Sequence, residues 1–267
     1  MTEKHELRLA CDIGGTFTDT VLMDGDGNVV ATAKTPTTID EPALGALDGA
    51  RRVIVDAGTD LARVTGMIHG TTLATNALIE RRGARTATVT NTGFRDILEI
   101  AYERRHSQYS IDLVKPDLIV PRKRSFTIGG RIDVQGRELE PLDVHAVKEL
   151  AKQLRNTEVE ALAVCLLHSY ANPAHELRLR DLLFREMPEL SISLSHEISP
   201  EAREFDRLCT TIANAYVQPL MFGYLADFKA RFQAEGLTCP ILMMTAGGGM
   251  TTLETASRLP IRLVESG

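Results

Sequence analysis

Nine consecutive residues near the start of the chain combine groups that bind the phosphates of a nucleotide. Residues 11–19 read Cys-Asp-Ile-Gly-Gly-Thr-Phe-Thr-Asp. The adjacent glycines Gly14 and Gly15 let backbone amides approach phosphate oxygens without a side chain in the way. Thr16 and Thr18 carry hydroxyls that can donate to phosphate. These residue types predict a phosphate site, and an ordinary glycine-containing hairpin is the alternative.

Two carboxylates frame the glycine pair and add a cation to the predicted site. Asp12 precedes the glycines, and Asp19 follows them. Carboxylate oxygens are ligands that Mg²⁺ prefers, either directly or through water. The chain contains neither the P-loop pattern nor a GxGxxG that opens a helix after a strand. We therefore expect the phosphate to bind at a β-hairpin rather than at a helix N-terminus.

Two further glycine-containing segments are candidates for the same site. His69-Gly70-Thr71-Thr72 lies where a predicted strand meets a helix N-terminus, a place where amides and hydroxyls bind anions. The alternative there is a glycine turn with threonine capping. Gly247, Gly248 and Gly249 follow a predicted buried strand. They form either a mobile bend or a surface for the base and ribose of a nucleotide.

The apolar pattern places each candidate segment at the end of a strand. Alternation predicts strands before and after the first glycine pair, and it predicts short strands before each of the other two segments. Helical periodicity predicts helices over residues 42–57, 73–82, 94–104, 144–154, 173–184 and 200–234, the last one bent near Pro219. Residues 260–267 are predicted as a strand that runs into a glycine turn.

Composition limits the class of protein. A chain of 267 residues with 43% apolar and 25% charged residues predicts a globular protein of two domains or subdomains. The net charge of −6 gives no support to binding of nucleic acid or a membrane surface. The four cysteines lack the spacing of a zinc site, no run approaches the ~20 apolar residues of a membrane span, and the charged N-terminus lacks a signal sequence. We therefore expect a cytoplasmic protein.

Six blocks of sequence together resemble one known family, the hydantoinase A/oxoprolinase family. Its members include N-methylhydantoinase A, 5-oxoprolinase and the ATP-binding subunits of acetone and acetophenone carboxylases. The resemblance covers nearly all of the chain and is specific for the family rather than for its substrate. The blocks are DIGGTFTD at 12–19, HGTTLATNALIERRGARTATVT at 69–90, GFRDILEIAYERR at 93–105, CLLHSYANPAHE at 165–176, SLSHEISPEAREFDR at 193–207 and TTIANAYVQPL at 210–220.

The resemblance implies an α/β fold similar to actin and hexokinase, with ATP and Mg²⁺ in the cleft of two domains. Asp12 would orient the metal or its water, and Asp19 would share the catalytic role. Phosphate would be held by the glycine pair, Thr16 and Thr18, with Thr71 and Thr72 nearby, and the nucleoside would face the glycines at 247–249.

The implied activity is ATP-dependent phosphorylation of a carbonyl oxygen, for hydrolysis of a cyclic amide such as a hydantoin or 5-oxoproline. The ATP-binding subunit of a ketone carboxylase is the alternative within the family, and a nucleotide-binding protein without turnover is an alternative from another class. The resemblance also implies a larger partner subunit of the hydantoinase B type. The sequence does not identify a pocket that would determine the substrate.

The resemblance divides the chain at residue 180. Residues 1–180 correspond to the N-terminal region of the family, and residues 181–267 to the start of its hydantoinase A domain, incomplete here. Family members continue beyond a Ser-Gly like Ser266-Gly267 into a second phosphate loop, and many carry a serine where this chain has Ala246. We therefore expect the chain to be one segment of a longer polypeptide or to be completed by a partner, and to bind ATP weakly by itself.

Overall fold

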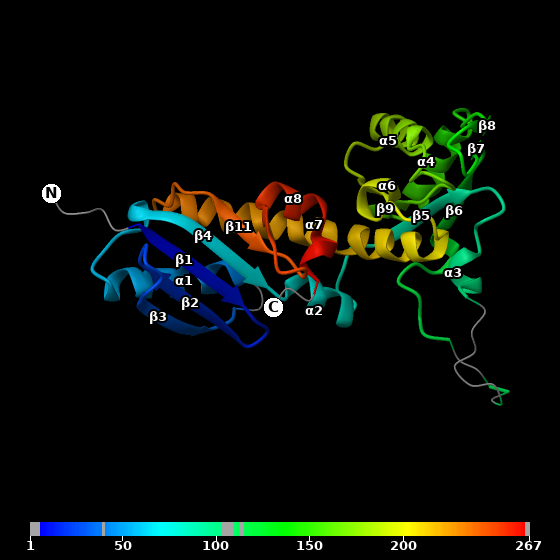
Figure 1. The fold of residues 1–267 in the computed structure, drawn as a ribbon. Coiled ribbons are helices and arrows are strands. Elements are labelled where there is room, and N and C mark those ends of the chain that lie inside the picture. Colours follow the sequence, from blue (N-terminus) through cyan, green and yellow to red (C-terminus); the bar gives the residue numbers. More distant parts are fainter. Residues whose placement is uncertain (1–5, 39–40, 103–108, 110, 113–114, 265–267) are drawn as a thin grey trace. The chain divides into compact units, whose positions relative to one another are not determined.

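The computed structural model describes two compact units (Figure 1). Unit 1 comprises residues 1–82 and 220–267, and unit 2 comprises residues 83–219. Helices and strands are mixed in both units, which confirms the expected α/β class. The division expected at residue 180 concerned family regions and stays a prediction. The described residues are all those outside 1–5, 39–40, 103–108, 110, 113–114 and 265–267.

Unit 1 is built on a six-stranded sheet with the order β12-β11-β4-β1-β2-β3. β1, β4 and β11 run parallel to one another, whereas β2, β3 and β12 are antiparallel to their neighbours. The carboxyl ends of the three parallel strands therefore lie at one edge of the sheet. The strands are β1 (Leu7–Ile13), β2 (Phe17–Met23), β3 (Val29–Pro36), β4 (Val64–Thr71), β11 (Ile241–Met244) and β12 (Met250–Thr252).

One face of this sheet forms the core of unit 1. In β1 the residues Leu7, Leu9, Cys11 and Ile13 are buried, while the residues between them are more exposed. Helix α1 (Pro42–Asp56) packs on this sheet, and a Cβ at its Gly49 would meet the Thr20 side chain. The remaining helical elements are α2 (Leu73–Ile79), α8 (Leu253–Arg258), the short 3₁₀ turns η1 (Leu61–Arg63) and η3 (Pro260–Leu263), and the second half of α7 (Glu204–Ala234).

Three expectations about elements are corrected. Residues 260–263 form a 3₁₀ turn that begins at Pro260, not a strand, and residues 265–267 lie outside the described part. The helix expected over 94–104 is a single turn, α3 (Ile97–Ile100), and positions 103–104 lie outside the description. Helix α7 begins at residue 204 rather than 200 and includes Pro219. Among the described residues no helix is both long and apolar enough to cross a membrane.

Unit 2 contains a four-stranded, all-parallel sheet with the order β10-β9-β5-β6. Leu162 and Val164 of β9 face the core formed with α4 and α5, while Ala161 and Ala163 face the opposite core with the first half of α7. Burial on both faces explains why β9 reads as a continuous apolar run. The elements are β5 (Thr86–Asn91), β6 (Ser125–Ile128), β7 (Arg131–Ile132), β8 (Glu138–Glu140), β9 (Ala161–Val164), β10 (Ser191–Leu194), η2 (Arg122–Arg124), α4 (Ala146–Asn156), α5 (Ala174–Glu186) and α6 (Ser195–Ile198).

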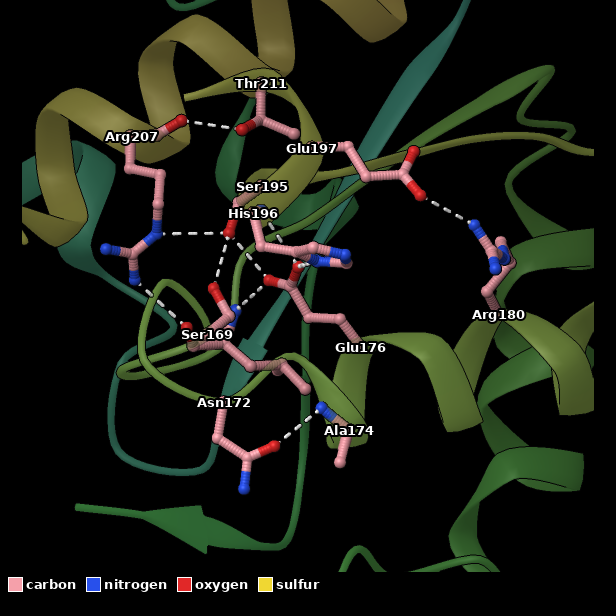
Figure 2. A network of polar contacts seen from close by, with 11 residues as sticks. Ser169, Asn172, Ala174, Glu176, Arg180, Ser195, His196, Glu197, Arg207 and Thr211 are labelled. Carbon is pink, nitrogen blue, oxygen red and sulfur yellow. Dashed lines mark hydrogen bonds and ion pairs between the residues drawn. The ribbon is translucent and has the colours of Figure 1, made fainter. Parts of the chain in front are cut away.

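A buried polar network ties the helix starts of unit 2 to the sheet (Figure 2). The Glu176 side chain is fully buried and accepts hydrogen bonds from the Ser195 hydroxyl at 2.6 Å and from His196 Nδ1 at 2.7 Å. Arg207, also fully buried, donates from Nε to the same Ser195 hydroxyl at 3.1 Å and from Nη2 to the Leu166 carbonyl at 3.0 Å. Two opposite charges are thus satisfied inside unit 2 through a shared serine.

Candidate functional site

The three segments predicted for the site leave the sheet of unit 1 at the same edge. The β1–β2 turn follows Ile13, which pairs with Thr71 at the end of β4. On the other side of β4, His69 pairs with Met243, so that the glycine run at 247–249 follows the neighbouring carboxyl end. The arrows of β1 and β4 point the same way in Figure 1. Ligands of α/β proteins bind at the carboxyl ends of parallel strands.

The glycine pair closes a tight turn between β1 and β2. The Gly14 amide donates to the Phe17 carbonyl at 3.0 Å, and a Cβ at Gly14 would lie 3.1 Å from that oxygen. A Cβ at Gly15 would have no closer neighbour than Asn76 Nδ2, at 3.7 Å. Neither glycine has a positive φ. A Cβ at position 14 would therefore press on the Phe17 carbonyl, whereas a Cβ at position 15 would make only an ordinary contact.

Asp12 is the carboxylate at the centre of this edge. It pairs with Asp19 across the hairpin and with Gly70 of β4, and a Cβ at Gly70 would lie 2.8 Å from Asp12 Oδ1. Within the described residues no hydrogen bond or ion pair involves the Asp12 carboxylate. Desolvation, followed by the charge of Asp19, raises its pKa. Both effects mark a carboxylate that a cation would stabilise.

Asp19 lies on the same face of the hairpin, since directly opposed residues of antiparallel strands share a face at about 4.5–5.5 Å between Cβ atoms. Lys34 Nζ contacts its Oδ1 at 3.1 Å and lies 5.1 Å from the centre of the Phe17 ring. Asp19 is therefore already paired, and Asp12 is the carboxylate of this pair that could hold a metal. The described residues hold no cluster of three or more potential protein ligands, and Mg²⁺ commonly binds one or two carboxylates together with phosphates and water.

Two of the predicted threonine hydroxyls have partners inside the protein. Thr18 is fully buried, and its Oγ1 lies 3.1 Å from Thr37 Oγ1. Thr71 is also buried; its Oγ1 accepts from the Leu73 amide at 3.2 Å and donates to Tyr224. These two side chains lie on the core face of the sheet, opposite to Asp12.

The other two threonines remain at the surface of the edge. Thr16 is exposed in the turn. Thr72 is half-buried, and its amide donates to the Ile13 carbonyl at 3.1 Å. Its hydroxyl donates to the same carbonyl at 3.4 Å and accepts from Asn76 Nδ2 at 3.3 Å. The geometry therefore favours the exposed Thr16 for direct contact with a ligand, and Thr18 and Thr71 for support of the strands. The Thr72 hydroxyl could donate to a ligand only by giving up its hydrogen bond to Ile13.

The late glycines form the exposed turn of the β11–β12 hairpin. The Thr245 amide donates to the Gly249 carbonyl at 2.9 Å, and the Gly248 amide donates to the Thr245 carbonyl at 2.9 Å. Only Gly248 has a positive φ, and no atom lies within 4 Å of a Cβ at Gly247 or Gly248. The turn itself requires one glycine, so that the other two keep an open surface beside the edge.

The motifs of the sequence did not identify the buried support beneath this edge. His69 is fully buried, its Nδ1 lies 3.0 Å from the Cys11 carbonyl, and its Nε2 lies 2.5 Å from the Tyr224 hydroxyl. Phe228 stacks on its ring at 4.3 Å between centroids. Burial lowers the pKa of His69 to about 4. The one available signal was that His69 follows the alternation of buried residues in β4.

Comparison with known families assigns almost the whole chain. The family model described as the hydantoinase/oxoprolinase N-terminal region matches residues 8–187, and the hydantoinase/oxoprolinase model matches residues 207–267. The chain belongs to the hydantoinase/oxoprolinase family. The resemblance stated from the six sequence blocks is thereby confirmed.

Relatives within this family include both hydrolases and carboxylases. The chain is 32% identical to caprolactamase subunit alpha of Pseudomonas jessenii over 99% of its own length, and 31% identical to the acetophenone carboxylase gamma subunit of Aromatoleum aromaticum over 89%. It covers 39% and 35% of those proteins, respectively. The chain thus spans about two fifths of the length of these curated relatives.

Two solved structures share the fold. A nucleotide-free acetone carboxylase matches 98% of the chain with a TM-score of 0.87 and 25% identity, and the ATP-dependent caprolactamase of Pseudomonas jessenii matches 96% with a TM-score of 0.84 and 31% identity. The chain covers 39% and 38% of those structures. The names of both describe ATP-dependent enzymes.

Proposed function

We propose that the edge of unit 1 holds the phosphates of ATP together with Mg²⁺. The observation that carries this proposal is the Asp12 carboxylate, which has no partner within the described chain and lies against Gly70 where three glycine-containing segments meet. Its oxygens fit a hard cation, and the exposed Gly15, which carries no side chain, leaves the backbone accessible to phosphate oxygens. Bound Mg²⁺ would neutralise phosphate charge.

In this proposal the residues of the chain position and neutralise rather than react covalently. Asp12 orients the cation or its bound water, the amides of residues 15 and 16 and the Thr16 hydroxyl contact phosphate, and Thr72 contacts it from the start of α2, directly after β4. Asp19 shares the catalytic face and keeps the local charge balanced through Lys34. The turn at 247–249 faces the nucleoside. Such fixed donors lower the barrier of phosphoryl transfer by positioning and electrostatic stabilisation.

We further propose that the acceptor of the γ-phosphoryl group is the carbonyl oxygen of a cyclic amide. Transfer of the γ-phosphoryl group from ATP to this oxygen would release ADP and give an O-phosphorylated imidate with a more electrophilic carbon. Addition of water to this carbon, followed by cleavage of the C–N bond with the proton going to the amine, would open the ring to an acyl phosphate, whose hydrolysis releases phosphate. The 32% identity to a caprolactamase subunit over nearly the whole chain supports a hydrolase of this kind. The relatives are subunits by name, so that turnover is proposed to require a further subunit.

A ketone carboxylase is the second candidate function. The TM-score of 0.87 to acetone carboxylase and the 31% identity to an acetophenone carboxylase subunit support it. In that case phosphorylation would activate the enol of a ketone for carboxylation, with bicarbonate as the source of the carboxyl group. The proposed phosphate site and its residues are the same for both reactions.

Measurement of ADP release tests both candidate functions in one experiment. The protein, assembled with any further chain that turnover requires, is supplied with Mg-ATP and then with caprolactam, 5-oxoproline, hydantoin, or acetophenone with bicarbonate. Stimulation by a cyclic amide alone supports the hydrolase, and bicarbonate-dependent stimulation by the ketone supports the carboxylase. Binding of ATP without stimulation by any of them supports the nucleotide-binding protein without turnover. Asp12→Asn removes the proposed metal ligand, and Asp26→Asn, in an exposed turn, is the control.

A further inference from the structure

We propose that Tyr224 of helix α7 is a positioning residue that holds the end of β4 in place beneath the phosphate edge. The blocks of sequence that carry the family resemblance do not include this residue, and its hydroxyl lies on the core face of β4, opposite to Asp12. The step from Tyr224 to the edge of the sheet follows from hydrogen bonds within unit 1. The link to nucleotide rests on the proposed function.

The hydrogen bonds around Tyr224 have only one possible direction. The Cys11 carbonyl can only accept, so that His69 Nδ1 must carry the proton and donate to it. His69 Nε2 is then an acceptor, and the Tyr224 hydroxyl must donate to it at 2.5 Å. The phenol oxygen in turn accepts from the hydroxyl of Thr71. The chain of donors therefore runs from Thr71 through Tyr224 and His69 to β1.

The residues linked by these hydrogen bonds are shielded from solvent, so that water cannot easily replace a lost partner. His69 and Phe228 are fully buried, and 8% of Tyr224 is exposed. The Phe228 ring covers one face of the imidazole, at 4.3 Å and nearly parallel. Loss of the phenol hydroxyl would leave His69 Nε2 and the Thr71 hydroxyl without their buried partner. Unsatisfied buried polar groups drive local rearrangement.

Rearrangement at His69 and Thr71 would act directly on the proposed site. These two residues flank Gly70, and Gly70 lies against the Asp12 carboxylate. The next amide, that of Thr72, donates to the Ile13 carbonyl immediately before the glycine turn. Tyr224 thus holds two successive core-face residues of β4, while the site uses the residues between and after them.

Tyr224→Phe tests the proposal because it removes one oxygen atom and keeps the ring. We expect the Thr72 amide to exchange its hydrogen about tenfold faster or more, the consequence of losing one buried hydrogen bond. In the assembled enzyme we expect the KM for ATP to rise by a similar factor, with a smaller change in kcat. Two control variants on the same helix are Tyr216→Phe, which alters a buried phenol in unit 2, and Phe232→Leu, which alters a buried ring that stacks on Phe228.

The two measurements separate the possible failures. If Tyr224→Phe matches the controls at equal loss of thermal stability, both in Thr72 exchange and in the KM for ATP, Tyr224 is only a packing residue and the proposal is wrong. Faster exchange with an unchanged KM would also overturn it, because the strand end would then not position nucleotide. An unmodified protein without ATP-dependent turnover contradicts the proposed function instead, and hydrogen exchange at Thr72 still decides the positioning role.

Discussion

The Asp12 carboxylate occupies the space that a side chain at Gly70 would need. A Cβ at Gly70 would lie 2.8 Å from Asp12 Oδ1, closer than real Cβ contacts occur. The two residues pair across the parallel strands β1 and β4. Glycine at this position therefore allows the carboxylate to lie over the sheet rather than turn away from it.

Replacement of Gly70 by alanine is expected to displace the Asp12 carboxylate. The fold should survive, because the Asp12 side chain can rotate away from the new methyl group, whereas ATP-dependent turnover should fall by about tenfold or more. Kinetics together with circular dichroism measure both effects. The matched control is Gly66→Ala, earlier in the same strand, where no atom lies within 4 Å of the new Cβ. Equal activity of the two variants would contradict the close packing of Asp12 on Gly70.

Asp12→Asn is expected to remove turnover rather than folding. The amide keeps the shape of the side chain but loses the charge that we assign to cation binding. The expected loss in kcat is about 10²-fold or more, as for removal of a group that stabilises developing charge. ADP release at saturating Mg-ATP measures it. Near-normal activity in a folded variant would show that Asp12 does not serve the metal.

Substitutions of the two glycines of the turn are expected to have different effects. Gly15→Val places a branched side chain where the Cβ would meet only Asn76 Nδ2, at 3.7 Å, so that the protein should fold with nearly normal stability but lose affinity for ATP. Gly14→Ala places a Cβ 3.1 Å from the Phe17 carbonyl and should lower the melting temperature. Calorimetric titration with Mg-ATP and thermal unfolding of both variants distinguish the roles. Unchanged ATP affinity in folded Gly15→Val would exclude this turn as the phosphate site.

His69 should make the stability of unit 1 depend on pH. Burial lowers its pKa from 6.5 to about 4 in the folded protein, so that the unfolded chain binds more protons between these values. Stability from this residue is fully present above pH 6.5, decreases as the pH falls toward 4, and changes no further below that. The total is on the order of 3 kcal/mol.

Denaturant unfolding between pH 4 and pH 7 measures this dependence. The His69→Gln variant should lose this part of the pH dependence, while the His145→Gln variant, altered at an exposed position, should retain it. A pH profile that is identical in the unmodified protein and His69→Gln would contradict the assignment of a neutral, buried His69.

Glu176→Gln is expected to destabilise unit 2 strongly. The carboxylate accepts four hydrogen bonds in a fully buried site, and its loss leaves the buried Arg207 cation uncompensated. Breaking a buried charge network at one member costs about 3–5 kcal/mol. Equilibrium unfolding measures the loss. Replacement of Glu235, an exposed partner of Arg51, is the control and should leave the free energy of unfolding nearly unchanged.

The sequence predicted the strands and turns that carry the site residues better than the buried residues that support them. Alternation around the glycine pair gave the β1–β2 hairpin because the strands are adjacent in sequence, and strand endings placed Thr71 and the late glycines at strand ends. The sequence could not predict which strands are neighbours in the sheet. The paired strands β4 and β11 are separated by about 170 residues, and no local pattern encodes that pairing. The partnership of His69 with Tyr224 depends on the same long-range contact.

The orientation of side chains explains the remaining differences. Thr18 and Thr71 look equivalent to Thr16 and Thr72 in sequence, but the two-residue period of a strand turns them to the core face. The final segment reads as a strand from its apolar residues, yet Pro260 and the absence of a paired neighbour in the described chain leave it as a 3₁₀ turn.

The order of the two units along the chain has a consequence for synthesis on the ribosome. Unit 2 is one continuous stretch, whereas unit 1 is assembled from two stretches on either side of it. During translation β1 to β4 emerge first, but β11 is made only after all of unit 2. Unit 2 therefore has every residue of its core available before β4 meets its second neighbour. The proposed phosphate edge is therefore completed only after unit 2 has been made, so that nascent chains halted before residue 241 lack β11 and the glycine turn beside it.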